Sequence, residues 1–263
     1  MRIVVIGTGN VATILARKCK EAGHSILQIY GRNEQEARRL ASLVEANFTN
    51  SLNDLVTGAD IYLLSVSDSA ISVIAGQLNL GDGLLVHTAG SVSREVLKPA
   101  SNQYGVLYPL QSLRKEMEFL PEIPLLIDGN TPEGLHTIQQ LASSISDKVQ
   151  QLDDNSRLHL HVAAVVVSNF TNHLYALTDD YCKKESLDFS MLFPLINEVS
   201  RRLYDFAPRT VQTGPAIRND VTTIAKHLEL LKDYPALKEL YGKFSESIRS
   251  EWGRETSNVK SEK

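Results

Sequence analysis

Short apolar runs alternate with stretches of helical periodicity through the first half of the chain. This alternation predicts β-α-β units built around a parallel sheet. The runs at 61–66 and 124–127 are almost continuously apolar, as expected for strands that helices cover on both faces. We expect strands at 2–6, 25–30, 46–48, 61–66, 84–87, 106–108, 124–127 and 148–151. We expect helices between them at 11–21, 34–43, 70–77 and 132–143.

The pattern changes after residue 151, where strand-like runs stop and only helical periodicity remains. The longest helical stretch is 153–183, and shorter ones follow at 189–206, from Asp220, and after Pro235. The sequence therefore predicts two domains. A Rossmann-type, doubly wound, mainly parallel α/β domain covers 1–152, and an all-α domain covers 153–253. The polar residues 254–263 predict a disordered tail.

Composition excludes several classes of protein. With 27 Lys and Arg against 31 Asp and Glu, the net charge is −4, which argues against general nucleic-acid binding. The longest apolar run, 162–167, is too short to cross a bilayer, and the start of the chain does not resemble a signal peptide. Two cysteines far apart in sequence indicate no disulfide framework. We expect a cytoplasmic protein that binds neither nucleic acid nor membrane.

The strongest motif lies between the first predicted strand and the first predicted helix. A G-x-G-x-x-G/A turn in this position is typical of dinucleotide-binding sites. The first glycine permits the tight turn, the second lets the backbone approach the pyrophosphate, and the small third residue lets the helix pack closely. The N-terminus of the helix then offers free N–H groups to the diphosphate. The motif residues are Gly7, Thr8, Gly9, Asn10, Val11 and Ala12.

The end of the second strand indicates which nucleotide is bound. Sites for NAD place an acidic residue here for the ribose 2′-hydroxyl, whereas this chain has Gly31, Arg32 and Asn33. A guanidinium at Arg32 suits a 2′-phosphate. The sequence therefore favours NADP(H), although Arg32 as an ordinary solvated arginine stays open.

Two further strand ends are expected to face the cofactor, because ligands lie at the carboxyl ends of parallel strands. The first is Ser65, Val66 and Ser67, whose small side chains leave room for ribose and nicotinamide. For Asp68, next in sequence, we expect a helix-capping role. The second strand end comprises Thr88, Ala89 and Gly90, and Ser91 follows it as a candidate substrate ligand.

These residues together resemble a known family. The motifs GTGNVA, YGRN, SVSD, HTAGS, LYPLQS and TGPAIRND look like those of Rossmann-like proteins with an uncharacterised helical C-terminal domain, labelled NADP oxidoreductases. More distant relatives include pyrroline-5-carboxylate reductase, prephenate dehydrogenase, and the β-hydroxyacid and 6-phosphogluconate dehydrogenases. The resemblance implies a nicotinamide cofactor on the N-terminal domain. It also implies a helical domain that dimerises and completes the active site, and it leaves the substrate open.

The catalytic residues of these relatives do not transfer as a set. Where prephenate dehydrogenases carry a catalytic histidine before proline, this chain has Tyr108. Where β-hydroxyacid enzymes carry a lysine one turn before an asparagine, this chain has Asn169 but no lysine. The resemblance therefore leaves the proton donor to be found among the chain's own residues.

Polar residues in the helical domain supply further candidates. Asn169 and His173 are four residues apart, which places them on one face of the long helix. They form a polar notch where His173 would donate a proton and Asn169 would orient the substrate; bonding to backbone or to a dimer partner is the alternative. Arg218 is a candidate clamp for a substrate carboxylate, and Asp220 a candidate cap of the helix that follows. His159 and His161 lie two residues apart on a helix without a third ligand, so we expect no metal site.

The sequence predicts an NADP(H)-dependent oxidoreductase that moves a hydride between nicotinamide and a small carbonyl or imine substrate. His173 is the first candidate acid and Tyr108 the second, and Ser91, Asn169 and Arg218 are the expected substrate ligands. We also expect a homodimer formed through the helical domain. Two alternatives stay open: a non-catalytic NADP(H)-binding sensor, and hydride exchange with a deazaflavin.

Overall fold

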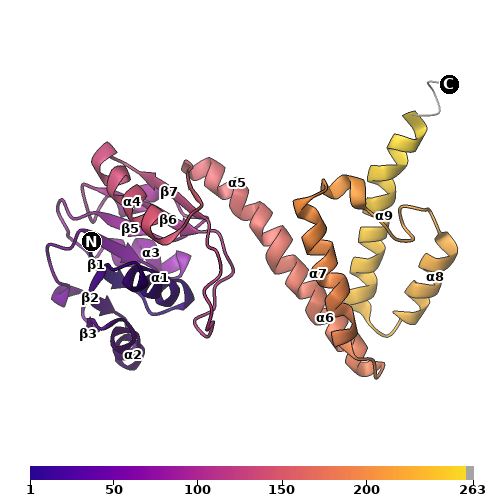
Figure 1. Cartoon of the computed structure of the whole chain (residues 1–263), viewed down its shortest axis with the longest axis horizontal. Coiled ribbons are helices and arrows are strands. Elements are labelled where there is room, and N and C mark those ends of the chain that lie inside the picture. The colour runs from indigo at the N-terminus through magenta and orange to yellow at the C-terminus, as the bar shows by residue number, and fades with distance from the viewer. Residues whose placement is uncertain (259–263) are drawn as a thin grey trace. The chain divides into compact units, whose positions relative to one another are not determined.

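The computed structural model describes residues 1–258, and side chains as far as Glu251. The chain divides into two compact units, a sheet unit of residues 1–167 and a helical unit from residue 168 onward. Figure 1 labels most of the helices and strands of both. The sheet ends at residue 151, close to the predicted domain change at 153, but the first helix after it groups with the sheet unit. Of the predicted tail, residues 254–258 continue the last helix, and 259–263 lie outside the described residues.

The eight strands that the hydrophobic pattern predicts form one sheet, in the order β3-β2-β1-β4-β5-β6-β7-β8. Every pairing is parallel except that of β6 with β7, so the predicted mainly parallel sheet is confirmed. The chain order reverses at β1 and β4, which creates the crevice where such sheets bind ligands. The strands are β1 Arg2–Ile6, β2 Ser25–Tyr30, β3 Asn47–Thr49, β4 Ile61–Leu64, β5 Leu85–His87, β6 Tyr104–Pro109, β7 Leu125–Gly129 and β8 Val149–Gln151.

Helices cover both faces of the sheet because its strands are apolar on both sides. Alternate residues of β1 belong to two separate cores. Ile3 and Val5 pack with residues of α1, α2 and α4, whereas Val4 and Ile6 pack with residues of α3. The helices of this unit are α1 Asn10–Glu21, α2 Glu34–Val44, α3 Asp68–Ala75, α4 Pro132–Ile145 and α5 Asp154–Ala164.

A continuous helical stretch begins in the sheet unit, ends in the helical unit and contains one irregularity. The predicted helix 153–183 is helical throughout, but Val165–Phe170 winds as a π-helix between α5 and α6. The predicted helix 189–206 ends early, because α7 stops at Arg201 and a 3₁₀ turn follows. The helices are α6 Thr171–Lys184, α7 Phe193–Arg201, α8 Val221–Leu230 and α9 Pro235–Asn258. The 3₁₀ turns of the two units are Leu52–Asp54, Arg94–Leu97, Phe189–Leu192, Arg202–Tyr204 and Pro208–Val211.

Candidate active site

The turn between β1 and α1 packs directly on the end of β4. The Gly7 N–H donates to the Tyr30 carbonyl oxygen at 2.8 Å, and Gly7 has a φ of +131°. A Cβ at this position would lie 2.1 Å from the Ser65 carbonyl oxygen. Only glycine fits such a backbone at such a distance, so the first glycine of the motif is required by the fold itself.

The second glycine of the motif has a different role. Gly9 precedes α1 in an extended conformation with a φ of −78°, and a Cβ there would meet no atom within 4 Å. No side chain caps the helix, and its first turn holds no acidic residue. The first N–H groups of α1 therefore face open space with a positive helix dipole behind them, which is the arrangement that binds phosphate.

A cavity of about 780 Å³ lies beside this turn, at the crevice between β1 and β4. It brings together most of the predicted nucleotide ligands, along with Tyr30, Ala70 and Ile74, which the motif does not indicate. Ala12 instead lies in the core beneath α1, where its small side chain allows close packing. Thr88, Ala89 and Gly90 are buried at the end of β5 and do not line the cavity. The predicted residues that do line it are Gly7, Thr8, Gly9, Asn10, Val11, Gly31, Arg32, Asn33, Ser65, Val66 and Ser67.

The end of β2 forms one wall of this cavity. A Cβ on Gly31 would lie 2.6 Å from the Thr8 methyl carbon, so glycine lets the nucleotide turn pack against the strand end. Asn33 caps α2 by accepting the Glu36 N–H at 3.2 Å. Arg32 between them is exposed and bonds to no other described residue. Its guanidinium is therefore available to an anion in the cavity.

Tyr108 of β6 and His161 of α5 meet beside Gly90, in the turn after β5. The Tyr108 hydroxyl lies 2.9 Å from His161 Nδ1, and their rings meet edge to face. A Cβ on Gly90 would lie 2.8 Å from both His161 Nδ1 and Tyr108 Cζ. Sequence reasoning missed His161, which it considered only as a metal ligand. The sequence feature that could have indicated His161 is its spacing of four residues from Arg157. This spacing places both side chains on one face of α5, the face that contacts the loop after β5.

A second polar pair lies at the same end of the sheet. Ser91 Oγ donates a hydrogen bond to the Asp68 carboxylate. The expected capping role of Asp68 is wrong, because Ser67 is the N-cap of α3 and no side chain bonds to the N–H groups there. Asp68 is instead the first residue of α3 and orients Ser91. Ser91 and Tyr108, both candidate site residues from the sequence, thus lie beside Gly90.

Buried charge surrounds this cluster. Arg157 is 1% exposed and donates to the Val92 carbonyl oxygen and to Asp154, both at 2.6 Å. Burial raises the pKa of Tyr108, and the Asp68 charge raises it further, while the Arg157 charge opposes both. Burial, assisted by Arg157, lowers the pKa of His87 to about 4. The site therefore holds Tyr108 as a neutral hydrogen-bond donor near a fixed cation.

The chain's similarities to known proteins agree with this geometry. Residues 2–90 match a family described as NADP oxidoreductase, coenzyme F420-dependent, and residues 123–248 match a domain of unknown function. A Bacteroides fragilis protein, described as a "putative NADP oxidoreductase", is 41% identical over 95% of this chain and 98% of its own, with a TM-score of 0.89. The chain belongs to this NADP oxidoreductase family. NADP(H) as the cofactor is confirmed at the level of the family.

Two further solved structures resemble this NADP oxidoreductase. A Thermotoga maritima protein is 25% identical over 94% of this chain and 98% of its own, with a TM-score of 0.78. An imine reductase from Myxococcus stipitatus, in complex with NADP+, is 14% identical over 95% of this chain and 93% of its own, with a TM-score of 0.65. At that identity the imine reductase shows a shared fold. No curated protein matches the sequence.

The residues of this NADP oxidoreductase fit its cofactor. The space beside Gly9 and the uncapped α1 N-terminus suit a pyrophosphate, and the exposed Arg32 suits a 2′-phosphate. Within the described residues, no group of three or more His, Cys, Asp or Glu is arranged to hold a metal ion. The helices of the described part of the chain are all too short or too polar to cross a membrane.

The remaining predicted site residues belong to the helical unit. Asn169 and His173 are exposed and have no hydrogen bond to each other or to another described side chain. Arg218 is exposed as well. Asp220 caps α8 by accepting the Thr223 N–H at 3.0 Å and the Thr223 hydroxyl at 2.7 Å, as predicted. The polar groups of Asn169, His173 and Arg218 are therefore free to take part in binding.

Proposed function

We propose that this NADP oxidoreductase transfers a hydride between NADP(H) and a small carbonyl or imine compound, with Tyr108 as the proton donor. The observation that supports this role most is the 2.9 Å contact between the Tyr108 hydroxyl and His161 Nδ1. It lies at the carboxyl end of the sheet, where doubly wound folds bind their ligands. A hydride acceptor of this kind needs a proton at its oxygen or nitrogen, which a positioned phenol can give.

When bound, NADPH supplies the hydride, and the protein's own residues handle the proton. The Tyr108 hydroxyl gives its proton to the substrate heteroatom. The Nδ1–H of His161 then gives its proton to the phenolate oxygen, and a proton taken from solvent at Nε2 restores the neutral imidazole. The Arg157 charge favours the phenolate that forms in this step. Ser91, oriented by Asp68, is available to hold the substrate.

The helical unit supplies further substrate ligands in this proposal. Asn169 contributes an amide that can pair with a carbonyl or an imine, and Arg218 a guanidinium that can hold a carboxylate. His173 is the competing candidate for the proton donor. Its imidazole is exposed, and it lacks a partner of the kind that orients Tyr108.

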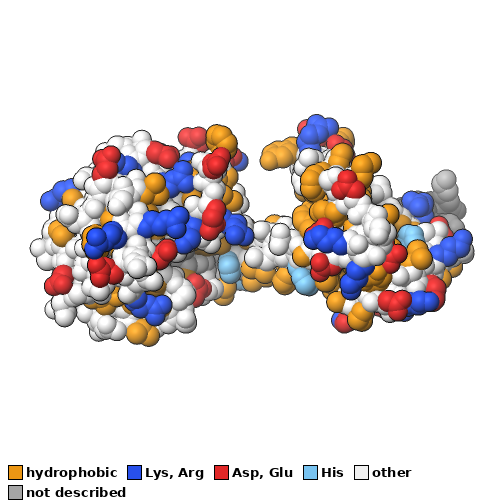
Figure 2. Space-filling model, turned by 90° about the horizontal axis from the view of Figure 1, so that it is seen from below, with side chains coloured by type: hydrophobic (Ala, Val, Ile, Leu, Met, Phe, Trp, Pro, Cys, Tyr) orange, Lys and Arg blue, Asp and Glu red, His pale blue; other side chains and the backbone are white. Residues whose placement is uncertain are grey.

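We also propose that the helical unit forms a homodimer. Large apolar side chains are exposed across it, among them Met191 at 77% and Tyr204 at 92%. Figure 2 shows orange side chains gathered on this unit. Exposed apolar surface of this extent marks an interaction site, and a second copy is the simplest partner for it. The exposed residues include Phe170, Leu187, Met191, Phe193, Leu195, Val199, Leu203, Tyr204 and Phe206.

The test is NADPH oxidation, followed at the nicotinamide absorbance, with a panel of cyclic imines, keto acids, small aldehydes and a deazaflavin. Turnover with an imine or carbonyl compound that falls in Tyr108→Phe supports the proposal. Turnover with the deazaflavin alone would mean that a deazaflavin, and not a carbonyl or imine compound, is the hydride acceptor. The match to the F420-dependent family covers residues 2–90, so it concerns the nucleotide-binding part of the chain. NADPH binding without turnover on any compound would favour a sensor.

A further inference from the structure

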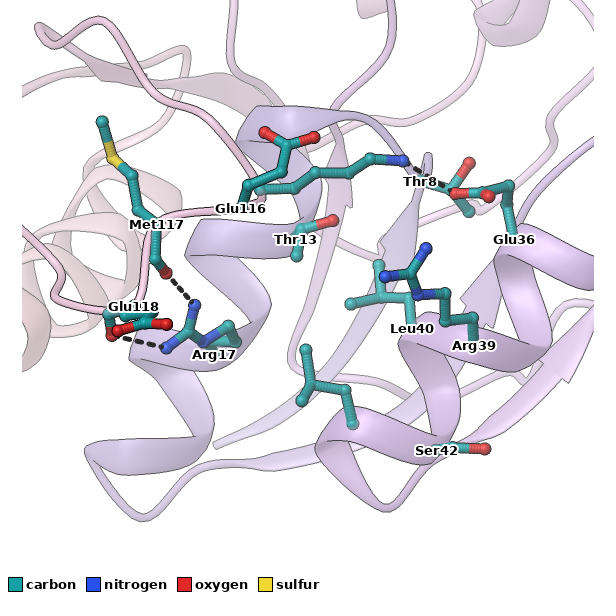
Figure 3. A pocket seen from close by; sticks show the side chains of 12 residues that line it. Thr8, Thr13, Arg17, Glu36, Arg39, Leu40, Ser42, Glu116, Met117 and Glu118 are labelled. Carbon is teal, nitrogen blue, oxygen red and sulfur yellow. Dashed lines mark hydrogen bonds and ion pairs between the residues drawn. The ribbon is translucent and has the colours of Figure 1, made fainter.

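A second cavity of about 780 Å³ lies on the other side of the nucleotide turn, between α1, α2 and the β6–β7 loop, residues 110–124. Figure 3 shows Thr13 and Arg17 from α1, and Glu36 and Arg39 from α2, around this space. Thr8 lines both this cavity and the nucleotide cavity. The two spaces therefore share a wall at the G-x-G turn.

The β6–β7 loop is fastened to α1 at two points. Arg17 donates to the carbonyl oxygens of Met117 at 2.8 Å and Glu118 at 3.4 Å, drawn as dashed lines in Figure 3. The Lys115 N–H donates to Asn10 Oδ1 at 3.1 Å. Because Asn10 is the first residue of α1, directly after Gly9, the loop backbone is held at the phosphate-binding turn.

The side chain of Lys115 continues from there to α2. Its Nζ lies 3.0 Å from Glu36 Oε2, and the two side chains are 34% and 39% exposed. Glu36 belongs to the first turn of α2, four residues after Arg32. The Lys115 ammonium lowers the pKa of Glu36, so the carboxylate is ionised. A half-buried pair of this kind is screened less than a surface pair.

Glu36 lines the second cavity, and it lies one helical turn after Arg32, which lines the nucleotide cavity. The adenosine ribose of a bound dinucleotide lies by the end of β2, and a carboxylate there favours NAD by bonding to the 2′-hydroxyl. Near a 2′-phosphate the same carboxylate is repulsive. Glu36 alone would therefore oppose Arg32, and Lys115 cancels that opposition because its ammonium neutralises the Glu36 carboxylate.

We propose that the Lys115–Glu36 pair is a specificity element that, with Arg32, sets the preference for NADP(H) over NAD(H). The inference rests on the proposed function only in that NADP(H) binds at the β1–α1 turn. In this proposal, the β6–β7 loop contributes to recognition of the 2′-phosphate. A purely structural pair would instead tie the loop to α2 and affect both nucleotides alike.

The experiment is calorimetric titration of the full chain with NADPH and with NADH, for wild type, Lys115→Ala, Glu36→Gln and the double variant. We expect Lys115→Ala to bind NADPH about tenfold more weakly, the scale of one partly screened charged contact, with NADH affinity within about twofold of wild type. The double variant should recover most of the NADPH affinity, because the repulsive carboxylate is gone. Glu36→Gln alone should bind NADPH at least as well as wild type.

The matched control is Lys20→Ala, which removes a Lys20–Glu45 pair of 2.7 Å between the C-terminal ends of α1 and α2. It should leave both affinities unchanged, and thermal unfolding checks that all variants fold. Equal losses for NADPH and NADH in Lys115→Ala, or no recovery in the double variant, would overturn the specificity role and leave the proposed function standing. A wild type that binds NADPH no better than NADH would overturn both.

Discussion

The Tyr108 hydroxyl and the His161 imidazole meet at 2.9 Å although 53 residues separate them in sequence. Tyr108 comes from β6 and His161 from α5, and the contact passes over Gly90, which has no side chain to block it. A phenol that is half-buried and bonded to an imidazole is held in one orientation and supplied with a route for its proton. This pair is where we place the chemistry of the enzyme.

Replacing Tyr108 by phenylalanine removes the hydroxyl and keeps the ring. We expect turnover to fall by about 10²–10⁴-fold, the usual contribution of a general acid, with NADPH affinity unchanged. His161→Gln should slow turnover less, because an amide can bond to the phenol but cannot pass a proton to it. Steady-state kinetics across pH, with calorimetry for NADPH, check both. Full activity in Tyr108→Phe would contradict the assignment.

The two glycines of the nucleotide turn should respond in opposite ways to valine. In Gly9→Val the new side chain meets open space and the backbone φ of −78° suits any residue, so thermal stability should hold while both nucleotides fail to bind. In Gly7→Val the side chain meets the Ser65 carbonyl oxygen at a φ of +131°, so the protein should lose stability by several kcal/mol. Thermal unfolding paired with NADPH titration separates the two effects. Undiminished NADPH binding by Gly9→Val would show that the turn is only structural.

Most of the sheet unit could be predicted from sequence because local pattern determines it. Strands covered on both faces are continuously apolar, as at β4. The G-x-G motif identifies its turn because the backbone at Gly7 admits only glycine. The same holds for Asp220, whose capping bond is made to a residue three positions away.

Contacts between distant segments could not be predicted in this way. From the sequence, Asp68 looks like a helix cap. Only the structure, in which the loop after β5 lies against the start of α3, shows that Asp68 bonds to Ser91. The contact between Tyr108 and His161 depends on which face of α5 lies against the Gly90 turn. The hydrophobic pattern of β6 or of α5 alone does not predict that face. The Lys115–Glu36 pair depends likewise on the path of an irregular loop.

The helical-unit residues give a separate test of the proton donor. If His173 is the acid, His173→Ala should abolish turnover as Tyr108→Phe does. With Tyr108 as the donor, we expect His173→Ala and Asn169→Ala to raise KM or lower kcat by about tenfold, the loss of one substrate contact. NADPH affinity should be unchanged in either case. A loss in His173→Ala as large as that in Tyr108→Phe would contradict our ranking of the two residues.

His87 should make the protein less stable in mild acid. Burial and the Arg157 charge lower its pKa from 6.5 to about 4, while Asp154 and Asp68 oppose the shift. Between these pH values the unfolded chain binds a proton that the native state does not, so stability falls as pH drops from about 6.5 to about 4. The group should contribute a loss of about 2 kcal/mol between pH 7 and pH 5.

The variant His87→Asn keeps an acceptor for the Ala89 N–H, which bonds to His87 Nδ1 at 3.2 Å, and removes the titration. Urea unfolding at pH 7 and pH 5 should therefore show a smaller acid loss in the variant by about that amount. An identical loss in wild type and variant would mean that His87 does not titrate on unfolding.

The central claim is that the crevice between β1 and β4 binds NADP(H) and recognises the 2′-phosphate of this cofactor. It is tested most directly by titrating wild type and Arg32→Ala with NADPH and NADH. We predict that wild type binds NADPH much more tightly than NADH. Arg32→Ala should lose roughly 1–3 kcal/mol of NADPH affinity, the scale of a charged hydrogen bond, and almost none for NADH. Equal losses for the two nucleotides, or no NADPH binding by wild type, would contradict the account.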